Sequence, residues 1–320
     1  MKRRAPVIAL LLLAPFVGEF LLGNISLREI FALPFLVPLY GAGALLIREV
    51  ARRTGRGWPT ILLLGAAYGV IEAGLVDQSL FNPSLDGWDF LAVTPVPALG
   101  ISAWHAMSFV MGHAVWSIAV PIALAELLVP DRAREPWLGR TGLVLTAVVY
   151  VLGCLEVFAF MFAAEEFLAT PGQMIGAAAV AAVLVVAAWR VPRRREPAGR
   201  GWVPRPRVLG AAVFAGLVVY QLRPETWGGF AFGIAWLVLL GTALVPLARR
   251  RRFGARHELA VVAAALAVYA LLGPVLTLMT TPDDPLRWVG NAVFAGIAVV
   301  LVLIARARTR PRVDAATPPG

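Results

Sequence analysis

The sequence predicts an all-α bundle of membrane-spanning helices, with about ten spans and both termini in the cytoplasm. Hydrophobic residues make up 59% of the chain, charged residues make up only 15%, and the mean hydropathy is +0.78. A soluble domain cannot bury that much apolar surface, whereas repeated apolar runs of about 20 residues are typical of a membrane bundle. The third observation is that basic residues gather in every second connection between these runs.

Ten apolar segments are each long enough to cross about 30 Å of hydrocarbon as a helix. Helices are expected because lipid offers no hydrogen-bond partners, so the backbone must satisfy its own polar groups. In chain order, the expected spans cover residues 6–22, 30–47, 59–78, 104–127, 141–164, 173–189, 208–222, 229–248, 259–280 and 288–305.

The first expected span has the basic start and the apolar core of a signal peptide. No small-residue cleavage site follows it, and the apolar run continues past Glu19. We therefore expect this segment to be retained as a span.

The connections that follow indicate the orientation of the spans. Of the 29 basic residues, 26 lie at the N-terminus and on alternate connections, within residues 2–4, 48–56, 132–140, 190–207, 249–256 and 306–312. Only Arg28, Arg223 and Arg287 lie on the other connections. This asymmetry follows the positive-inside rule and indicates ten spans, with both termini inside, in a prokaryotic cytoplasmic (inner) membrane.

The arginine-rich connections also predict a partner, which is a lipid bilayer with anionic headgroups on the cytoplasmic side. No nucleic acid is expected despite a net charge of +10, because no binding module accompanies the basic residues. The single cysteine, Cys154, cannot form an intrachain disulfide. The sequence has no Cys/His metal pattern and no phosphate-binding glycine loop, so neither a metal nor a cofactor is expected.

No soluble domain is visible between the expected spans. Residues 1–170 hold the first five spans, residues 171–312 hold the other five, and residues 313–320 are expected to form a disordered tail. The long outer connection at 79–103 carries no basic residue and is long enough to fold over the outer mouth of the bundle.

Ionisable residues inside the expected spans mark the candidate site, because a charge in hydrocarbon is costly and usually faces the protein interior. At about 1.5 Å per residue, Glu19, Glu72 and Glu156 lie roughly 20 Å from the cytoplasmic ends of their spans. On the same scale His113 lies about 16 Å below the outer end of its span. Four groups from four helices are therefore expected to share one level in the outer half of the membrane.

Two further ionisable groups and two glycines belong to the same candidate site. Asp77 and His105 lie at the outer ends of the third and fourth expected spans. Gly65 and Gly69 form a G-x-x-x-G pair, which lets another helix approach closely. Because Glu72 follows Gly69 by three residues, it is expected to lie beside that contact face.

The spacing of the two histidines limits the kinds of chemistry that the candidate site could carry out. His105 and His113 are eight residues apart, or about 12 Å along a helix, which is too far for both to bind one metal ion. A carboxyl–imidazole pair can instead act as a general base with its orienting partner, or as a relay for a proton or cation.

Three stretches stand out when they are read together: YGAGALLIRE at 40–49, LGAAYGVIEAG at 64–74 with DQSLFNP at 77–83, and HAVWSIAVPIALAELLVP at 113–130. They resemble a family of uncharacterised prokaryotic multispan membrane proteins. The resemblance covers roughly residues 15–131, and it implies no particular activity.

The segment FVMGH, which ends at His113, lies downstream of Glu72, and the two residues are 41 positions apart. This pattern is similar to that of the CAAX-protease and bacteriocin-processing family of intramembrane glutamic peptidases. The similarity implies catalytic roles for Glu72 and His113. Ala73 stands where that family has a second glutamate, Asp77 stands at its arginine position, and Glu156 would have to replace its third-motif histidine.

Three functions remain open from the sequence. It favours a non-enzymatic membrane protein, transporter-like or accessory, whose outer-half carboxyl and histidine groups handle a proton, a cation or a small solute. The second is a structural or partner-binding protein whose polar groups only lock the bundle. The third is a diverged intramembrane hydrolase that uses Glu72 and His113. A short separation between these two side chains favours a site over dispersed structural groups.

Overall fold

The computed structural model describes residues 4–193 and 201–309 of the chain. Within these residues the regular secondary structure is helical apart from one short hairpin, which confirms the all-α prediction. Eight of the described helices are long and apolar enough to cross a membrane. Two shorter apolar helices, Ala5–Phe20 and Pro206–Gln221, stand where the first and seventh spans were expected. The expected tail at 313–320 lies outside the described residues.

The first four spans each contain a π-helical segment, in which the backbone hydrogen bonds close over one residue more than in an α-helix. These spans are α1 (Ala5–Pro15) with η1 (Phe16–Phe20); α2 (Ala32–Leu36), η3 (Val37–Gly41) and α3 (Ala42–Arg53); α4 (Trp58–Ile71) with η4 (Glu72–Val76); and α5 (Ala103–Gly112), η7 (His113–Ala119) and α6 (Val120–Leu128).

The later spans are continuous α-helices. They are α7 (Arg140–Glu165), α8 (Pro171–Arg190), α9 (Pro206–Gln221), α10 (Trp227–Ala248), α11 (Ala255–Thr280) and α12 (Pro285–Arg308). Three of them begin with proline, whose fixed φ and missing N–H suit a first helical position. Before α8, the Thr170 hydroxyl accepts the Gln173 N–H and caps the helix.

The connections contain the short elements of the fold. They are η2 (Leu27–Glu29), η5 (Leu85–Gly87), η6 (Phe90–Ala92), β1 (Pro95–Val96), β2 (Ile101–Ser102) and η8 (Pro130–Arg132). β1 and β2 pair antiparallel as a small hairpin in the long connection between the third and fourth spans. This connection packs onto the bundle, since the Leu99 carbonyl accepts a hydrogen bond from the Gln173 side chain at the start of α8.

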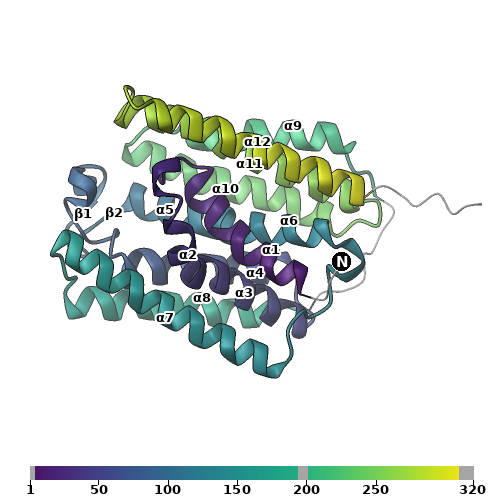
Figure 1. Cartoon of the computed structure of the whole chain (residues 1–320), viewed down its shortest axis with the longest axis horizontal. Helices are drawn as coiled ribbons and strands as arrows, with labels where there is room; N and C mark the ends of the chain where they lie inside the picture. The colour runs from purple at the N-terminus through teal and green to yellow at the C-terminus, as the bar shows by residue number, and fades with distance from the viewer. Residues whose placement is uncertain (1–3, 194–200, 310–320) are drawn as a thin grey trace, which may run out of the picture.

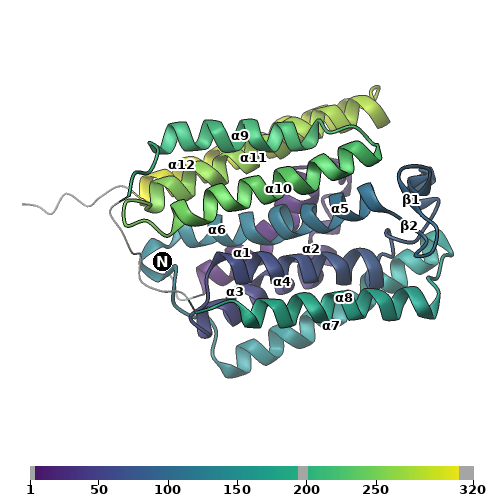
Figure 2. The same cartoon turned by 180° about the vertical axis from the view of Figure 1, so that it is seen from behind.

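The helices lie in three groups that run along one common direction. In Figure 1, α9, α11 and α12 lie along one side of the molecule, α7 and α8 lie along the other, and α1, α3, α4 and α6 lie between them. Figure 2 shows α10 beside α9 and close to α5. The N-terminus and the end of α12 lie at the same end of the bundle, as an even number of spans requires, and the hairpin lies at the opposite end (Figure 1).

Burial differs strongly between central and peripheral helices. In the most apolar stretch of the span Trp58–Val76, 61% of the residues are buried, whereas the corresponding values are 11% for α7 and 6% for α10. α8 packs chiefly against α4, although the sequence grouped it with the later spans. The interior of the bundle is therefore formed mainly by the first four spans, together with α11.

The second span extends further than expected. The arginines that begin at Arg48 predicted an end to this span near residue 47, but α3 continues to Arg53. Arg48 and Glu49 are completely buried, because each finds a partner of opposite charge inside the protein. This segment is therefore part of the helix and not an exposed connection.

Candidate functional site

The third and fourth spans approach each other through the predicted glycine pair. A Cβ added at Gly69 would lie 2.9 Å from the Val110 carbonyl oxygen and 3.1 Å from the His113 Cβ. A Cβ added at Gly65 would lie 3.1 Å from the Ala114 Cα. Any larger residue at these positions would push the two backbones apart.

This close approach brings Glu72 to His113. Nε2 of His113 lies 2.7 Å from Oε2 of Glu72, and the side chains are 14% and 5% exposed. Oε2 has no well-aligned hydrogen-bond donor among the described residues, so this is a close carboxylate–imidazole contact, which is an ion pair when His113 is protonated. The separation is within the range that favours a site over dispersed structural groups.

Tyr40, on η3, connects this pair to Glu19. Its hydroxyl oxygen lies 2.7 Å from Oε1 of Glu19 and 3.2 Å from Oε1 of Glu72. A phenol has only one proton to donate, so it cannot fully satisfy two ionised carboxylates at once. The three oxygens can therefore accommodate one additional proton.

Polar contacts continue beyond both ends of this group. The side-chain amide of Asn24, which is exposed, donates to Oε2 of Glu19 at 3.0 Å. In the interior, Nδ1 of His113 lies 3.1 Å from Oγ of the buried Ser117. A continuous series of polar contacts thus runs from the surface into the bundle. We name this series the polar relay, and its members are Glu19, Tyr40, Glu72, His113 and Ser117.

Every member of the polar relay lies in a π-helical segment. Glu19 belongs to η1, Tyr40 to η3, Glu72 to η4, and His113 and Ser117 to η7. π-helical turns are rare in proteins and often occur at functional sites. Four of them contribute side chains to one cluster, which distinguishes the relay from ordinary helix packing.

Aromatic rings line the polar relay. The ring centroid of Tyr68 lies 5.9 Å from that of His113 and 6.1 Å from that of Tyr40. The Tyr68 hydroxyl is buried and has no hydrogen-bond partner among the described residues. Buried polar atoms without a partner are uncommon, so this one needs an explanation.

Three other candidate residues lie outside the polar relay. Glu156 is exposed on the face of α7 that points away from the bundle, so it does not lie with the other groups at its depth. The His105 imidazole lies 3.0 Å from the Ser102 hydroxyl, near the hairpin. Asp77 accepts the Ser79 N–H at 2.9 Å, just beyond η4.

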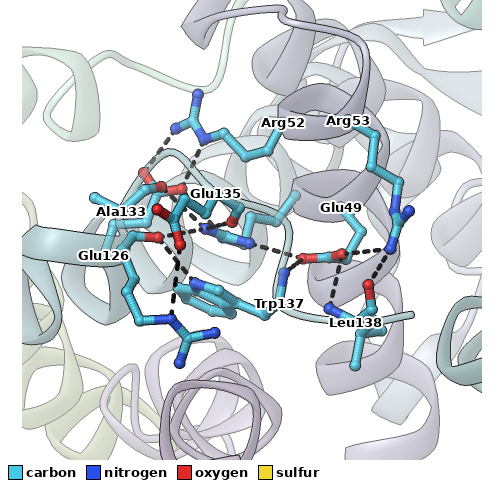
Figure 3. A network of polar contacts seen from close by, with 10 residues as sticks. Glu49, Arg52, Arg53, Glu126, Ala133, Glu135, Trp137 and Leu138 are labelled. Atoms are coloured by element: carbon cyan, nitrogen blue, oxygen red, sulfur yellow. Dashed lines mark hydrogen bonds and ion pairs between the residues drawn. The ribbon is translucent and has the colours of Figure 1, made fainter. Parts of the chain in front are cut away.

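A second polar cluster lies at the opposite end of the same spans, and the sequence pattern did not indicate it. Arg48 contacts Oε1 of Glu49 at 2.7 Å and Oε1 of Glu126 at 3.1 Å. Arg52 reaches Glu126 at 2.6 Å (Figure 3). Arg53 reaches Glu49 at 3.4 Å from the same helix (Figure 3). α3 and α6 are therefore joined by interlocking ion pairs.

The connection between α6 and α7 completes this cluster. Arg48 donates to the carbonyl oxygens of Ala133 and Glu135, both at 2.9 Å, and its guanidinium lies 3.3 Å from the ring centroid of Trp137. Glu49 accepts the backbone N–H of Trp137 at 2.8 Å and that of the next residue at 3.1 Å. We name this cluster the arginine clamp, and its members are Arg48, Glu49, Arg52, Arg53, Glu126 and Trp137.

The arginine clamp is a structural feature, because its charged groups are occupied by one another and by backbone groups. Buried charges are tolerated only when they are paired and hydrogen-bonded in this way. Among the residues that the structure describes, no group of three or more His, Cys, Asp or Glu side chains could hold a metal ion.

Arg223 is also buried, although it lies on a connection between two expected spans. It donates to the Tyr220 carbonyl at 2.7 Å and to the Ser108 hydroxyl. Its guanidinium lies 4.3 Å from the ring centroid of Trp104. Burial lowers the pKa of Arg223 from its ordinary value, because the charged form loses hydration. These contacts hold the connection between α9 and α10 against α5.

A family model described as "Uncharacterized membrane protein family" matches residues 8–314. The chain belongs to this family. The match extends far beyond the resemblance at 15–131 and includes both the polar relay and the arginine clamp. As a member of this uncharacterized family with eight described helices that could cross a membrane, the protein is a multi-pass membrane protein. No curated protein and no solved structure matches the chain.

Proposed function

We propose that this protein is a transporter-like or accessory protein of the cytoplasmic (inner) membrane, and that its polar relay binds and passes a proton. The observation that carries the proposal is the Tyr40 hydroxyl, which lies within hydrogen-bond distance of both Glu19 and Glu72. Chains of carboxyl, hydroxyl and imidazole groups inside a membrane are typical of proton pathways.

The charge of the relay supports proton binding. With Glu19 and Glu72 ionised and His113 protonated, the relay carries one net negative charge. A single charge inside a bundle is costly, and one added proton removes it. The unpartnered hydroxyl of Tyr68 offers a further polar contact beside this position.

The contacts permit a balanced transfer. A proton that arrives on Glu19 forms its O–H bond there. Tyr40 then takes this proton and releases its own to Glu72, so that one O–H bond breaks and one forms at the phenol oxygen. Glu72 is left protonated and its ion pair with His113 is weakened. The changed ion pair links proton uptake to the packing of the third and fourth spans.

Access is expected from the face opposite the N-terminus. Glu19 is partly exposed and its partner Asn24 is exposed at that end of the bundle. The distribution of basic residues makes this the outer face of the membrane. The relay therefore takes its proton from outside the cell in our proposal.

A hydrolytic function has one supporting observation, which is the order Ser117, His113 and Glu72, as in a hydrolase triad. However, Ser117 is only 2% exposed. A Cβ at Gly18 would lie 2.8 Å from its Oγ, so η1 covers the hydroxyl directly. We expect a fluorophosphonate probe not to label the protein, and labelling that is lost in Ser117→Ala would favour hydrolysis instead.

The proposal can be tested by infrared difference spectroscopy on the full chain in liposomes, between roughly pH 8 and pH 5. The carbonyl band of a protonated carboxyl should appear in the wild type and shrink in both Glu19→Gln and Glu72→Gln. In Tyr40→Phe, the band should appear roughly a hundredfold more slowly after a drop in pH, a typical contribution of a positioned proton-transfer group.

The matched control is Glu156→Gln, which removes an intramembrane carboxyl that faces outward from the bundle. It should leave both the band and its rate of appearance unchanged. If Glu156→Gln abolishes the signal as fully as Glu72→Gln does, or if neither variant changes it, the polar relay is not the proton site and the proposal fails.

A further inference from the structure

A groove opens between α9, α11 and α12, at the end of the bundle where α9 and α11 begin and α12 ends. Its volume is about 790 Å³. Its floor is apolar and is formed by Val208, Leu259, Ala260, Ala263 and Val302. Its rim carries four arginines, which are Arg205, Arg207, Arg256 and Arg306.

The described residues that line the groove carry charge of one sign only. None of them is acidic, and none of the four arginines forms an ion pair with a described carboxylate. α9 also begins at this groove with Pro206, and the first turn of a helix presents unpaired N–H groups and a partial positive charge. The rim is therefore complementary to an anionic group.

The apolar floor of the groove indicates which chemical group would lie beyond the anionic head of a ligand. From Arg256 the groove continues along α11 to Leu259 and Ala263, and from Arg306 it continues one turn back along α12 to Val302. Both helices lead away from the charged rim toward the middle of the bundle. A ligand that fills the groove must therefore carry an anionic head and an apolar chain.

We propose that this groove binds one anionic phospholipid, with its phosphate between the rim arginines and an acyl chain on the apolar floor. The positive-inside rule places this end of the bundle at the cytoplasmic leaflet, where anionic headgroups are available. The proposal goes beyond general attraction of arginine-rich connections to a charged surface, because it names one site of defined shape. It does not depend on the polar relay.

The test is lipid binding to the purified full chain in neutral detergent, followed by native mass spectrometry. Phosphatidylglycerol should be retained as a single tight adduct in preference to phosphatidylcholine. The variant Arg207→Gln/Arg256→Gln/Arg306→Gln should bind phosphatidylglycerol roughly a hundredfold more weakly, since each arginine near an anionic headgroup contributes about fivefold.

The matched control is Arg190→Gln/Arg249→Gln/Arg308→Gln, which removes the same charge from positions outside the groove. It should change the affinity by less than about threefold if the site is specific. An equal loss in this control would mean that only the surface charge matters, and it would overturn the proposal.

A further variant separates a lipid from a free anion. Ala263→Phe fills the floor without changing the charge, so it should weaken phosphatidylglycerol binding and leave the rim intact. Inorganic phosphate should compete poorly with the lipid in the wild type. If inorganic phosphate displaces the lipid efficiently, the groove binds anions in general. If Ala263→Phe does not weaken phosphatidylglycerol binding, no acyl chain occupies the groove. Either result would overturn the proposal.

Discussion

Replacing Glu49 by glutamine would test whether the arginine clamp stabilises the bundle. The carboxylate accepts four donors: Arg48 at 2.7 Å, the Trp137 N–H at 2.8 Å, the following N–H at 3.1 Å and Arg53 at 3.4 Å. In Glu49→Gln one of its oxygens becomes an NH₂ group that faces donors. Arg48 and Arg52 then share Glu126 as their only carboxylate within the clamp, and Arg53 loses the one that it contacts.

The expected loss follows from this geometry. Removing one partner of a buried ion pair costs about 3–5 kcal/mol, because the other charge stays buried without compensation. A loss of this size is a large fraction of the roughly 5–15 kcal/mol that stabilises a typical protein. It corresponds to a fall in Tm of roughly 4–7 °C for a chain of 320 residues.

The assay is thermal unfolding of the purified protein in detergent, followed by tryptophan fluorescence. Glu135→Gln is the matched control, because its carboxylate is 66% exposed and lies 3.9 Å from Arg132, a contact worth less than about 1 kcal/mol. A fall in Tm for Glu49→Gln no larger than that for Glu135→Gln would refute the reasoning that the clamp is a major source of stability.

Three more predictions follow from the structure. Gly69→Leu should destabilise the protein by about 1–3 kcal/mol, because its side chain would be forced against the neighbouring backbone. Gly296→Leu should not, because a Cβ added there meets open space, and urea unfolding compares the two variants. Trp116→Phe should cost about 1–2 kcal/mol, because the indole N–H donates to a backbone carbonyl at 2.9 Å, whereas the 74% exposed Trp202 should tolerate the same change in the same measurement. A cysteine introduced at the exposed Ser84 should react with a membrane-impermeant thiol reagent in intact cells, and a C-terminal green fluorescent protein fusion should fluoresce; the opposite pair of results would invert the orientation.

The sequence was sufficient to predict the helical bundle and part of the polar relay. Charged residues inside an apolar run are conspicuous, so Glu72 and His113 could be identified, and the G-x-x-x-G pair indicated that another helix packs closely beside Glu72. Tyr40 could not be singled out, because a tyrosine in an apolar segment gives no such signal. Its role depends entirely on which carboxylates lie beside its hydroxyl.

Depth along a helix is easier to infer from sequence than direction around it. A rise of about 1.5 Å per residue gives the height of a side chain along the helix. Glu156 and Glu72 show that, at similar heights, one side chain can face outward from the bundle while the other faces its interior. The arginine clamp was missed for a different reason. Arg48 and Glu49 follow an apolar run, and the pattern did not indicate that Glu126 and the connection to α7 would bury them.

The π-helical segment η3 determines the angle around the helix axis between the side chains that the second span contributes to the two polar clusters. Each residue turns an α-helix by about 100°, so closing one extra residue within a turn rotates everything beyond it by about that angle. Tyr40 lies in η3 and Arg48 follows in α3, and both must face the protein interior. Deleting a single residue from η3 would therefore turn either the tyrosine or the arginine away from its partners, even though no side chain of either cluster had been removed.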